Sequence, residues 1–213
     1  PQEEEMDIEK ELAQYNVSRE TKERLDRFVD VLQEWNNKIN LVSKNSMADV
    51  WERHVLDSLQ LMNYMPPSAK HLLDIGSGAG FPGAVLAIAL MEKQPLTKIT
   101  LVESIGKKTV YLKDVCARIG LLNTIVENKR IENMSLESID VITARAVASL
   151  DVLCGYCAPL VNAQTKLLFL KGRSYADEMT VAQQKWKYDC RIHKNMYSTD
   201  GVILEISNLR KIR

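Results

Sequence analysis

The sequence has no apolar run that could cross a membrane and no excess of either charge. Its longest apolar stretch, residues 84–91, falls far short of the roughly 20 residues that a bilayer requires, so we expect no membrane partner. The 28 basic and 28 acidic residues balance, which argues against indiscriminate binding to nucleic acids. The amino end is acidic and carries no signal peptide, so we expect a cytoplasmic protein.

Cysteine is scarce too, and its spacing does not indicate a metal or redox site. Cys154 and Cys157 form one C-x-x-C pair, whereas a structural zinc site needs four ligands and a reactive thiol usually sits at a helix amino end. Here the pair follows Leu150, Val152 and Leu153, inside a predicted helix. We therefore expect these thiols to lie in the core, and we expect no bound metal.

The charge that is present has an uneven distribution. Residues 1–34 carry 11 acidic and five basic residues, whereas residues 166–213 carry ten basic and five acidic ones. A basic carboxyl-terminal third leaves room for a surface that binds phosphate groups, although any single exposed lysine is more often simply solvated.

The chain is organised around residues 72–83, which predict a buried strand, a glycine turn and the start of a helix. The apolar residues within 72–75 suit a short strand. Gly76, Gly78 and Gly80 then let the backbone turn sharply and pass close to a bound molecule, because no Cβ intrudes. A glycine weakens a fold unless its backbone freedom is used, so three alternating glycines indicate a ligand.

Two classes of cofactor fit this turn. Residues 78–83 satisfy the dinucleotide pattern G-x-G-x-x-G, which places a pyrophosphate at the amino end of the helix. Asp74 ends the strand, and a carboxylate there would repel that anion. It suits instead a cofactor with a positive amino acid head and a sulfonium. The order acid-x-Gly-x-Gly-x-Gly is similar to the first motif of S-adenosylmethionine-dependent methyltransferases.

Strands and helices alternate after residue 66, which predicts an α/β fold. Seven strands are expected, at 71–75, 98–103, 124–127, 139–144, 166–170, 190–197 and 201–208. Helices are expected at 1–16, 19–38, 46–64, 82–93, 106–119, 148–161 and 175–187, and a short turn or helix near 130–136. This gives a mostly parallel sheet with helices on both faces and an antiparallel terminal hairpin. We divide the chain into a helical cap, 1–65, and a cofactor-binding domain, 66–213, and expect a monomer.

Three details of the helices can be checked directly. Ser18 is expected to cap the helix 19–38. Ser46 with Asp49 resembles a capping arrangement for the helix that follows. In the helix after the second strand, Val110 is expected to face the core.

The helix at 46–64 brings together Arg53, His54, Asp57 and Ser58, because residues three and four apart are neighbours on a helix. A Ser-His-Asp hydrolase triad does not fit, since all three residues sit on one helix and no nucleophile elbow is present. Two interpretations stay open. The patch is either a set of mutual hydrogen bonds, or a surface that closes over a cofactor or contacts substrate phosphate.

Ligands bind beyond the carboxyl ends of the strands in open α/β sheets, and polar residues gather there. Glu103 ends the second strand, where an acid can bind both hydroxyls of an adenosine ribose. Residues 128–132 follow the third strand and suit an adenine ring. Arg145 follows the fourth strand, where it pairs with an acid or binds a carboxylate or phosphate. Lys171 follows the fifth.

Several motifs together resemble the glucose-inhibited division protein B family, the ribosomal small-subunit RNA guanine-N7 methyltransferases. They are EWNNKINL at 34–41, RHVLDSL at 53–59, the turn at 74–83, ESIGKK at 103–108 and TARAVA at 143–148. The resemblance covers residues 20–172, and the combination of the RHxxDS helix with the glycine turn is specific to this family. It implies a class I S-adenosylmethionine-dependent methyltransferase (Rossmann-like) fold with an N-terminal helical cap.

The resemblance also implies the residues of the site. Gly76, Phe81, Ile131, Glu132 and Arg145 match the family's S-adenosylmethionine positions, and Glu103 matches its ribose-binding acid. The expected cofactor site comprises Asp74, Gly76, Gly78, Gly80, Phe81, Glu103, Ser104, Ile131, Glu132 and Arg145. The residues expected to hold ribosomal RNA are Arg53, His54, Lys107, Lys108, Arg145 and Lys171.

The implied reaction needs no general base. Guanine N7 carries an in-plane lone pair and no proton, so catalysis can consist of placing N7 in line with the sulfonium methyl. We therefore assign no catalytic residue, and expect an enzyme that methylates a guanine of small-subunit (16S) ribosomal RNA. Two alternatives stay open: a methyltransferase for a small molecule or protein, and an NAD-dependent oxidoreductase.

Overall fold

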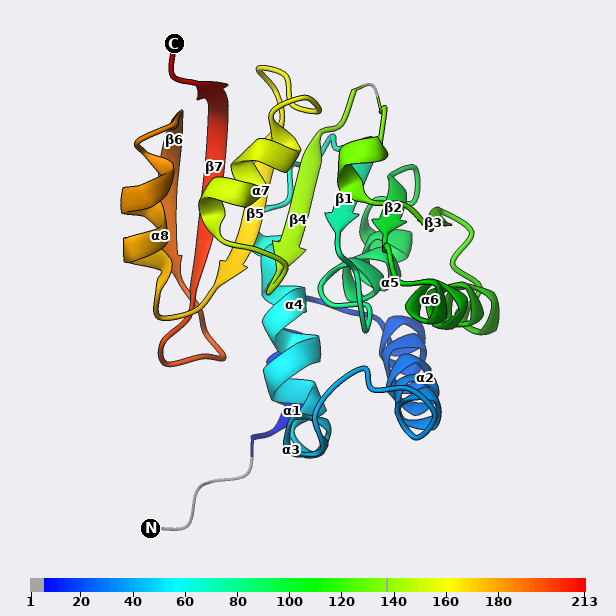
Figure 1. Cartoon of the computed structure of the whole chain (residues 1–213). Coiled ribbons are helices and arrows are strands. Elements are labelled where there is room, and N and C mark those ends of the chain that lie inside the picture. The colour runs from blue at the N-terminus through cyan, green and yellow to red at the C-terminus, as the bar shows by residue number, and fades with distance from the viewer. Residues whose placement is uncertain (1–5, 137) are drawn as a thin grey trace.

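A seven-stranded sheet forms the centre of the computed structural model, which describes residues 6–136 and 138–213 (Figure 1). The strands are β1 (His71–Ile75), β2 (Lys98–Val102), β3 (Thr124–Glu127), β4 (Val141–Arg145), β5 (Lys166–Lys171), β6 (Trp186–Lys194) and β7 (Val202–Lys211). Their order is β3-β2-β1-β4-β5-β7-β6. β7 pairs antiparallel with β5 and β6, and the other pairs are parallel. The predicted fold class is confirmed.

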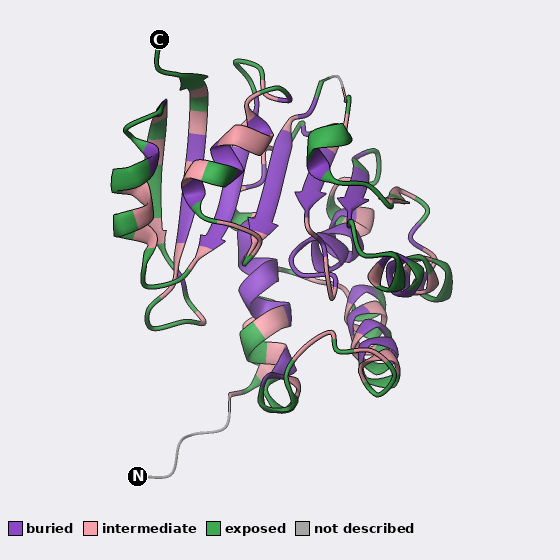
Figure 2. Ribbon diagram, viewed as in Figure 1, coloured by how far each residue is buried: buried purple, intermediate pink, exposed green. Residues whose placement is uncertain are grey.

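The central strands are buried on both faces, which is why most of their residues are apolar. Successive side chains point to opposite faces, so Leu72 and Leu73 of β1 join two different hydrophobic clusters. Figure 2 shows these strands buried along most of their length, with exposed residues on the outer sides of the helices. The sheet therefore separates two cores.

Helices cover both sides of the sheet. One side holds α5 (Gly83–Lys93) and α6 (Gly106–Ile119), and α2 (Arg19–Asn36) packs on both of them. The other side holds α7 (Leu150–Cys157) and α8 (Tyr175–Ala182), together with a 3-10 turn, η3 (Ile131–Asn133). Among the described residues, no helix combines the length and apolar character needed to cross a bilayer.

The predicted single helix at 46–64 is wrong. Ser43, not Ser46, caps α3 (Lys44–Ala48), because the Ser43 hydroxyl accepts a hydrogen bond from the Ser46 amide. Asp49 then leaves the helical region, with φ −107° and ψ 31°. The rest comprises a π-helical segment, η1 (Trp51–Leu56), α4 (Asp57–Leu59) and a 3-10 turn, η2 (Gln60–Tyr64). In Figure 1, α4 lies just below the carboxyl end of β4.

Other predicted elements are present with shifted boundaries. The first helix shrinks to α1 (Ile8–Ala13), and residues 1–5 of the prediction lie outside the described residues. Ser18 caps α2 as predicted. The final hairpin is longer than predicted, since β6 begins at Trp186 and β7 ends at Lys211.

The inward face of α6 differs from the prediction. Val110 is 57% exposed, so its predicted burial is wrong. Tyr111 is buried in its place and donates its hydroxyl to the Ala79 carbonyl at 2.8 Å. A large side chain bonded to the loop after β1 sets the rotation of α6, which apolar spacing alone does not reveal.

The N-terminal helices share one hydrophobic core with the sheet. Leu25 and Phe28 of α2 are fully buried in the same cluster as Leu86 of α5 and Leu72 of β1. The boundary between residues 65 and 66 stays a prediction, because the two parts share this core.

Candidate functional site

Three glycines shape the loop between β1 and α5. Gly76, Gly78 and Gly80 have φ values of +62°, +54° and +99°, in the region that side chains disfavour. A Cβ at Gly76 would lie 2.8 Å from a methyl carbon of Val147. The loop therefore packs directly against the segment after β4. The predicted sharp turn is confirmed, and the predicted close approach to a bound molecule stays a prediction.

A first hollow, of 270 Å³, opens beside this turn at the carboxyl ends of β1 and β2. Four predicted cofactor residues line it: Gly76, Ser104, Ile131 and Glu132. Its other lining residues are Ile75, Val102, Lys129, Arg130, Val147 and Tyr156. An apolar surface with a few polar groups suits a flat heterocycle attached to a ribose.

Glu103 lies between two residues that line the first hollow, and its carboxylate is already hydrogen-bonded. One oxygen accepts from the Gly78 amide and the other from the Ile105 amide, both at 2.8 Å. Glu103 is 5% exposed, so it ties the loop after β1 to the loop after β2. Each carboxylate oxygen keeps a further acceptor position for a ribose hydroxyl.

Asp74 lies under the turn rather than at its surface. It is fully buried, and its Oδ1 accepts from the Thr143 hydroxyl at 2.7 Å. Its Oδ2 lies against Gly83 and has no hydrogen-bond partner among the described residues. Burial, the largest cause, raises the pKa of Asp74 to about 6, although the hydrogen bond from Thr143 acts in the opposite direction. Because Asp74 is buried beneath the turn, the predicted effect of its charge on a cofactor would act across the turn and not by direct contact.

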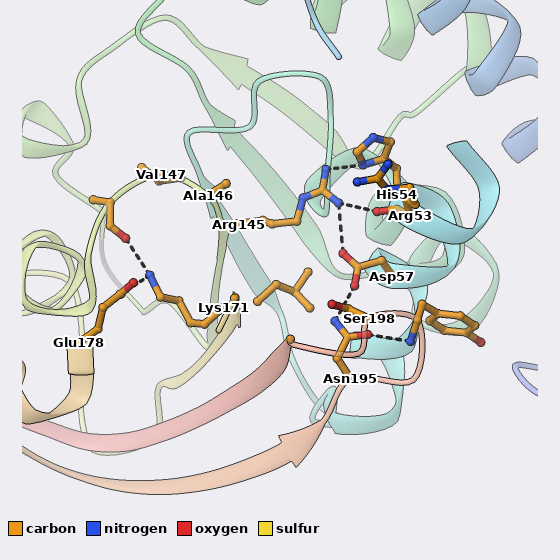
Figure 3. Close-up of a pocket in the computed structure, with 15 residues that line it drawn as sticks. Arg53, His54, Asp57, Arg145, Ala146, Val147, Lys171, Glu178, Asn195 and Ser198 are labelled. Atoms are coloured by element: carbon orange, nitrogen blue, oxygen red, sulfur yellow. Dashed lines mark hydrogen bonds and ion pairs between the residues drawn. The ribbon is translucent and has the colours of Figure 1, made fainter. Parts of the chain in front are cut away.

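A second hollow, of 560 Å³, shares Val147 with the first (Figure 3). It includes four residues predicted to hold RNA, Arg53, His54, Arg145 and Lys171, and also Asp57. Its remaining lining residues are Ala146, Ala148, Leu170, Gly172, Glu178, Asn195, Tyr197, Ser198 and Gly201. Because Val147 lines both hollows, molecules bound in the two would be neighbours.

Arg145 is the centre of the polar groups in the second hollow. Its guanidinium donates to Asp57 Oδ2 at 3.1 Å, to His54 Nδ1 at 2.9 Å and to the Arg53 carbonyl at 3.2 Å (Figure 3). Its guanidinium carbon lies 5.1 Å from the ring centroid of Phe81. The predicted pairing with an acid is present, and Arg145 also faces the hollow.

His54 is neutral in this arrangement. Its Nδ1 accepts from Arg145, so its proton is on Nε2. Burial, followed by the charges of Arg145 and Arg53, lowers the pKa of His54 to about 4. The imidazole stacks on Phe81 with centroids 4.9 Å apart. Ser58, predicted to share this patch, donates its hydroxyl to the His54 carbonyl.

The three lysines predicted to hold RNA differ in their surroundings. Lys171 lines the second hollow, but its ammonium pairs with Glu178 at 2.6 Å and donates to the Ala148 carbonyl at 2.8 Å. These contacts hold it in place instead of leaving it free for a phosphate. Lys107 and Lys108 begin α6 and belong to the lining of neither hollow.

The turn between β6 and β7 is a part of the site that sequence analysis missed. It supplies Asn195, Tyr197, Ser198 and Gly201 to the second hollow. β7 runs antiparallel to β5, and Val202 at its start pairs with Lys171 at the end of β5. The predicted hairpin, combined with pairing of β7 to β5, is the signal that could have located this turn at the site.

Comparison with known sequences identifies relatives over nearly the whole chain. The family model GidB, rRNA small subunit methyltransferase G, matches residues 21–206. The ribosomal RNA small subunit methyltransferase G of Parvibaculum lavamentivorans is 42% identical over 206 residues, covering 96% of this chain and 90% of that protein. The protein of the same name from Rickettsia akari is 41% identical over 196 residues, covering 92% and 98%.

Solved structures share the fold. A fibrillarin/Nop5p complex matches with a TM-score of 0.58 at 14% identity, covering 74% of this chain and 82% of that one. A SAM-dependent methyltransferase from Aquifex aeolicus matches with a TM-score of 0.58 at 12% identity, covering 74% and 92%. These structures support the class I, Rossmann-like methyltransferase fold, and the sequence relatives confirm the predicted resemblance. The chain belongs to the GidB family, rRNA small subunit methyltransferase G.

Proposed function

We propose that this chain transfers a methyl group from S-adenosylmethionine to N7 of a guanine in small-subunit ribosomal RNA. Membership in a family of ribosomal RNA methyltransferases supports the reaction class and excludes an oxidoreductase. The two hollows that share Val147 support it geometrically, because a transfer needs donor and acceptor side by side.

The first hollow fits S-adenosylmethionine. Gly76 has no Cβ, so Val147 packs directly on the turn while the Gly76 backbone itself lines the hollow and is open to a bound molecule. Ile131 and Val102 offer apolar surface to an adenine ring, while Ser104 and Glu132 offer polar atoms. When bound, S-adenosylmethionine supplies an electrophilic methyl group on a sulfonium.

The second hollow fits a guanine with no proton to remove. Its carboxylates are occupied, since Asp57 pairs with Arg145 and Glu178 pairs with Lys171. The His54 Nδ1 is occupied by Arg145 as well. None of these groups is free to act as a general base, and N7 needs none because it carries a lone pair. This occupied set of acids and imidazole is the observation that favours N7 over an oxygen or an exocyclic amine.

The remaining side chains position the RNA. Arg53 is exposed at the rim of the second hollow, where its guanidinium can bind a phosphate or stack on a base. His54 stacks on the Phe81 ring and Arg145 lies over it, so both groups are held in place before substrate arrives. The protein's contribution is orientation, with catalysis by proximity.

Transfer of a labelled methyl group tests this function. Purified protein is incubated with methyl-labelled S-adenosylmethionine and small ribosomal subunits that lack the modification. We expect label in the RNA and 7-methylguanosine after nuclease digestion. Label in another position, or in a small molecule or protein with unlabelled RNA, would contradict the proposal. The same reaction with naked RNA determines whether the assembled subunit is required.

The monomeric state and the cytoplasmic location stay predictions. Light scattering of the purified chain tests the first, with a mass near 24.2 kDa expected.

A further inference from the structure

Asn195 is an almost fully buried amide at the edge of the second hollow, in the turn after β6. It is 4% exposed, and its Nδ2 donates to Asp57 Oδ1 at 2.7 Å (Figure 3). Its Oδ1 accepts from Gln60 Nε2 at 2.9 Å and from the Tyr197 amide at 2.8 Å. These bonds fix the orientation of the amide, because the donor faces an acid and the acceptor faces two N–H groups.

Asp57 is shared between Asn195 and Arg145. Its Oδ1 accepts from Asn195 and, at 3.2 Å, from Gln60. Its Oδ2 pairs with the Arg145 guanidinium at 3.1 Å. The carboxylate therefore connects the terminal hairpin to the arginine at the centre of the hollow.

Gln60 completes the support on this side. Its Nε2 also donates to the Asp57 carbonyl at 3.0 Å, and its Oε1 accepts from the Met196 amide at 3.0 Å. The hairpin turn and the helical segment are thus joined by reciprocal hydrogen bonds between buried groups. Such a network is rigid only while every member is satisfied.

We propose that Asn195 is a positioning residue for methyl transfer, which holds the Asp57 carboxylate so that the Arg145 guanidinium stays at the second hollow. The effect of this role on catalysis rests on the proposed function. Asn195 is not assigned a contact with substrate, because its side-chain nitrogen and oxygen already bind protein groups. The terminal hairpin thereby becomes part of the active centre.

Removal of the Asn195 side chain would leave the Asp57 carboxylate without a fixed orientation. Without the Asn195 donor, Asp57 Oδ1 keeps only the longer bond from Gln60, and the carboxylate can rotate. Asp57 Oδ2 is then no longer held toward the Arg145 guanidinium, although the contacts of Arg145 with His54 and Phe81 remain. Hydrogen bonds to charged groups are the ones whose removal has the larger effect.

A double-mutant cycle tests the route through Arg145. Single-turnover methyl transfer to small subunits is measured for the wild type, Asn195→Ala, Arg145→Ala and the double variant. We expect Asn195→Ala to reduce the rate roughly 10-fold or more in the wild-type background and less than about 2-fold in the Arg145→Ala background. An equal reduction in both backgrounds, or none in the wild type, would overturn the proposal.

A second measurement does not depend on RNA. The side-chain N–H signals of Arg145 are assigned in an NMR spectrum by their disappearance in Arg145→Ala. We expect these signals to shift or broaden in Asn195→Ala, whereas unchanged signals would overturn the positioning role. If the wild type transfers no methyl group to RNA, the proposed function fails while this measurement still decides the role of Asn195.

Asn195→Asp separates positioning from a general loss of packing, because it is nearly isosteric. Its carboxylate would face Asp57, whose negative charge raises the pKa of the new carboxyl group. Protonation of the new carboxyl group restores a donor, so the rate relative to wild type should rise as the pH falls from about 8 to about 5.5. A pH-independent ratio would contradict the proposal.

Two controls accompany this variant. The charged and titratable groups around position 195 are Asp57, Arg145, His54, Arg53, Tyr197, Tyr15 and Glu11. All are present in the wild type, so dividing the two rates cancels the part of their titration that the substitution leaves unchanged, and the ratio reports the new carboxyl group and its coupling to Asp57. Asn162→Asp adds the same charge at an exposed turn before β5 and should leave the rate unchanged at every pH.

Discussion

Gly76 is the residue at which the cofactor turn leaves no room for a side chain. An alanine there would hold φ at +62° and place its Cβ 2.8 Å from Val147. We expect Gly76→Ala to weaken binding of S-adenosylhomocysteine about 10-fold or more, because the clash moves Val147 into the hollow that both residues line. Isothermal titration calorimetry measures the affinity.

Gly120→Ala is a matched control for the backbone. Gly120 has φ of +77°, and no atom of the described residues lies within 4 Å of an added Cβ. The variant therefore bears a similar backbone strain of roughly 1–2 kcal/mol without the clash. Affinity should be normal in Gly120→Ala and should recover when Val147→Ala is added to Gly76→Ala. The steric explanation does not survive if Gly120→Ala binds as weakly as Gly76→Ala.

Asp74 makes the stability of the fold depend on pH. Its folded-state pKa, about 6, lies above its ordinary value of 3.8, so the folded protein holds this proton more tightly than the unfolded chain. The stabilisation is complete below about pH 4 and is lost as the pH rises through about 6. Asn cannot ionise, so Asp74→Asn should gain up to ~3 kcal/mol relative to wild type across this window. Urea unfolding of both proteins at several pH values measures the gain, and a constant difference would contradict it.

Among the elements, the segment from Ser43 to Tyr64 shows where sequence reasoning fails. Spacing correctly placed His54 near Asp57, since both side chains bind Arg145. It did not predict the π-helical turn η1, whose backbone leaves the Arg53 carbonyl to accept from Arg145. The partner of that carbonyl lies 92 residues away, and periodicity along the segment contains no information about it.

The glycine turn and the parallel sheet were predictable because both depend on residue type and on the pattern along the chain, not on a distant partner. The turn depends on backbone freedom at three positions, which residue type alone reports. The parallel sheet follows from the alternation of strands and helices. Asn195 was missed because its role depends on the pairing of β7 with β5, which brings distant parts of the chain to one hollow.

The position of the C-x-x-C pair on α7 makes both thiols unreactive, because it buries them in the core. Cys154 and Cys157 are fully buried in the carboxyl-terminal half of this helix, in the core as predicted. Burial raises the pKa of Cys154 to about 12, and it raises the pKa of Cys157 as well. We expect iodoacetamide at about pH 8 to label neither thiol in the folded protein and both in urea, as read by peptide mass spectrometry. Rapid labelling of Cys154 without unfolding would contradict this assignment.

In the whole molecule, the sheet and the N-terminal helices are one packed unit. Phe28 of α2 lies 5.3 Å from Phe81 of the cofactor turn, measured between ring centroids. Trp35 of the same helix donates its indole N–H to Asp114 of α6 at 2.7 Å. Helix α2 therefore supports the glycine turn as well as covering α6. We expect the N-terminal helices and the sheet to unfold together.

Phe28→Ala tests that cooperativity. Removing this fully buried ring should lower the free energy of unfolding by roughly 3–5 kcal/mol. Because the core is shared, we expect one transition, with tryptophan fluorescence and far-UV circular dichroism moving to the same new denaturant midpoint. Two transitions, with only one displaced, would show instead that residues 1–65 unfold as an independent unit.

Leu25→Ala separates the stability of the cap from its support of the site. Leu25 is also fully buried on α2, so its loss should lower the unfolding free energy by roughly 2–5 kcal/mol. We expect normal binding of S-adenosylhomocysteine in Leu25→Ala and weaker binding in Phe28→Ala, measured where both variants are folded. The difference arises because the Phe28 ring packs against Gly80 and Phe81 of the glycine turn, and the same turn supplies Gly76 to the first hollow. Equal affinities in the two variants would limit the cap to stabilising the fold.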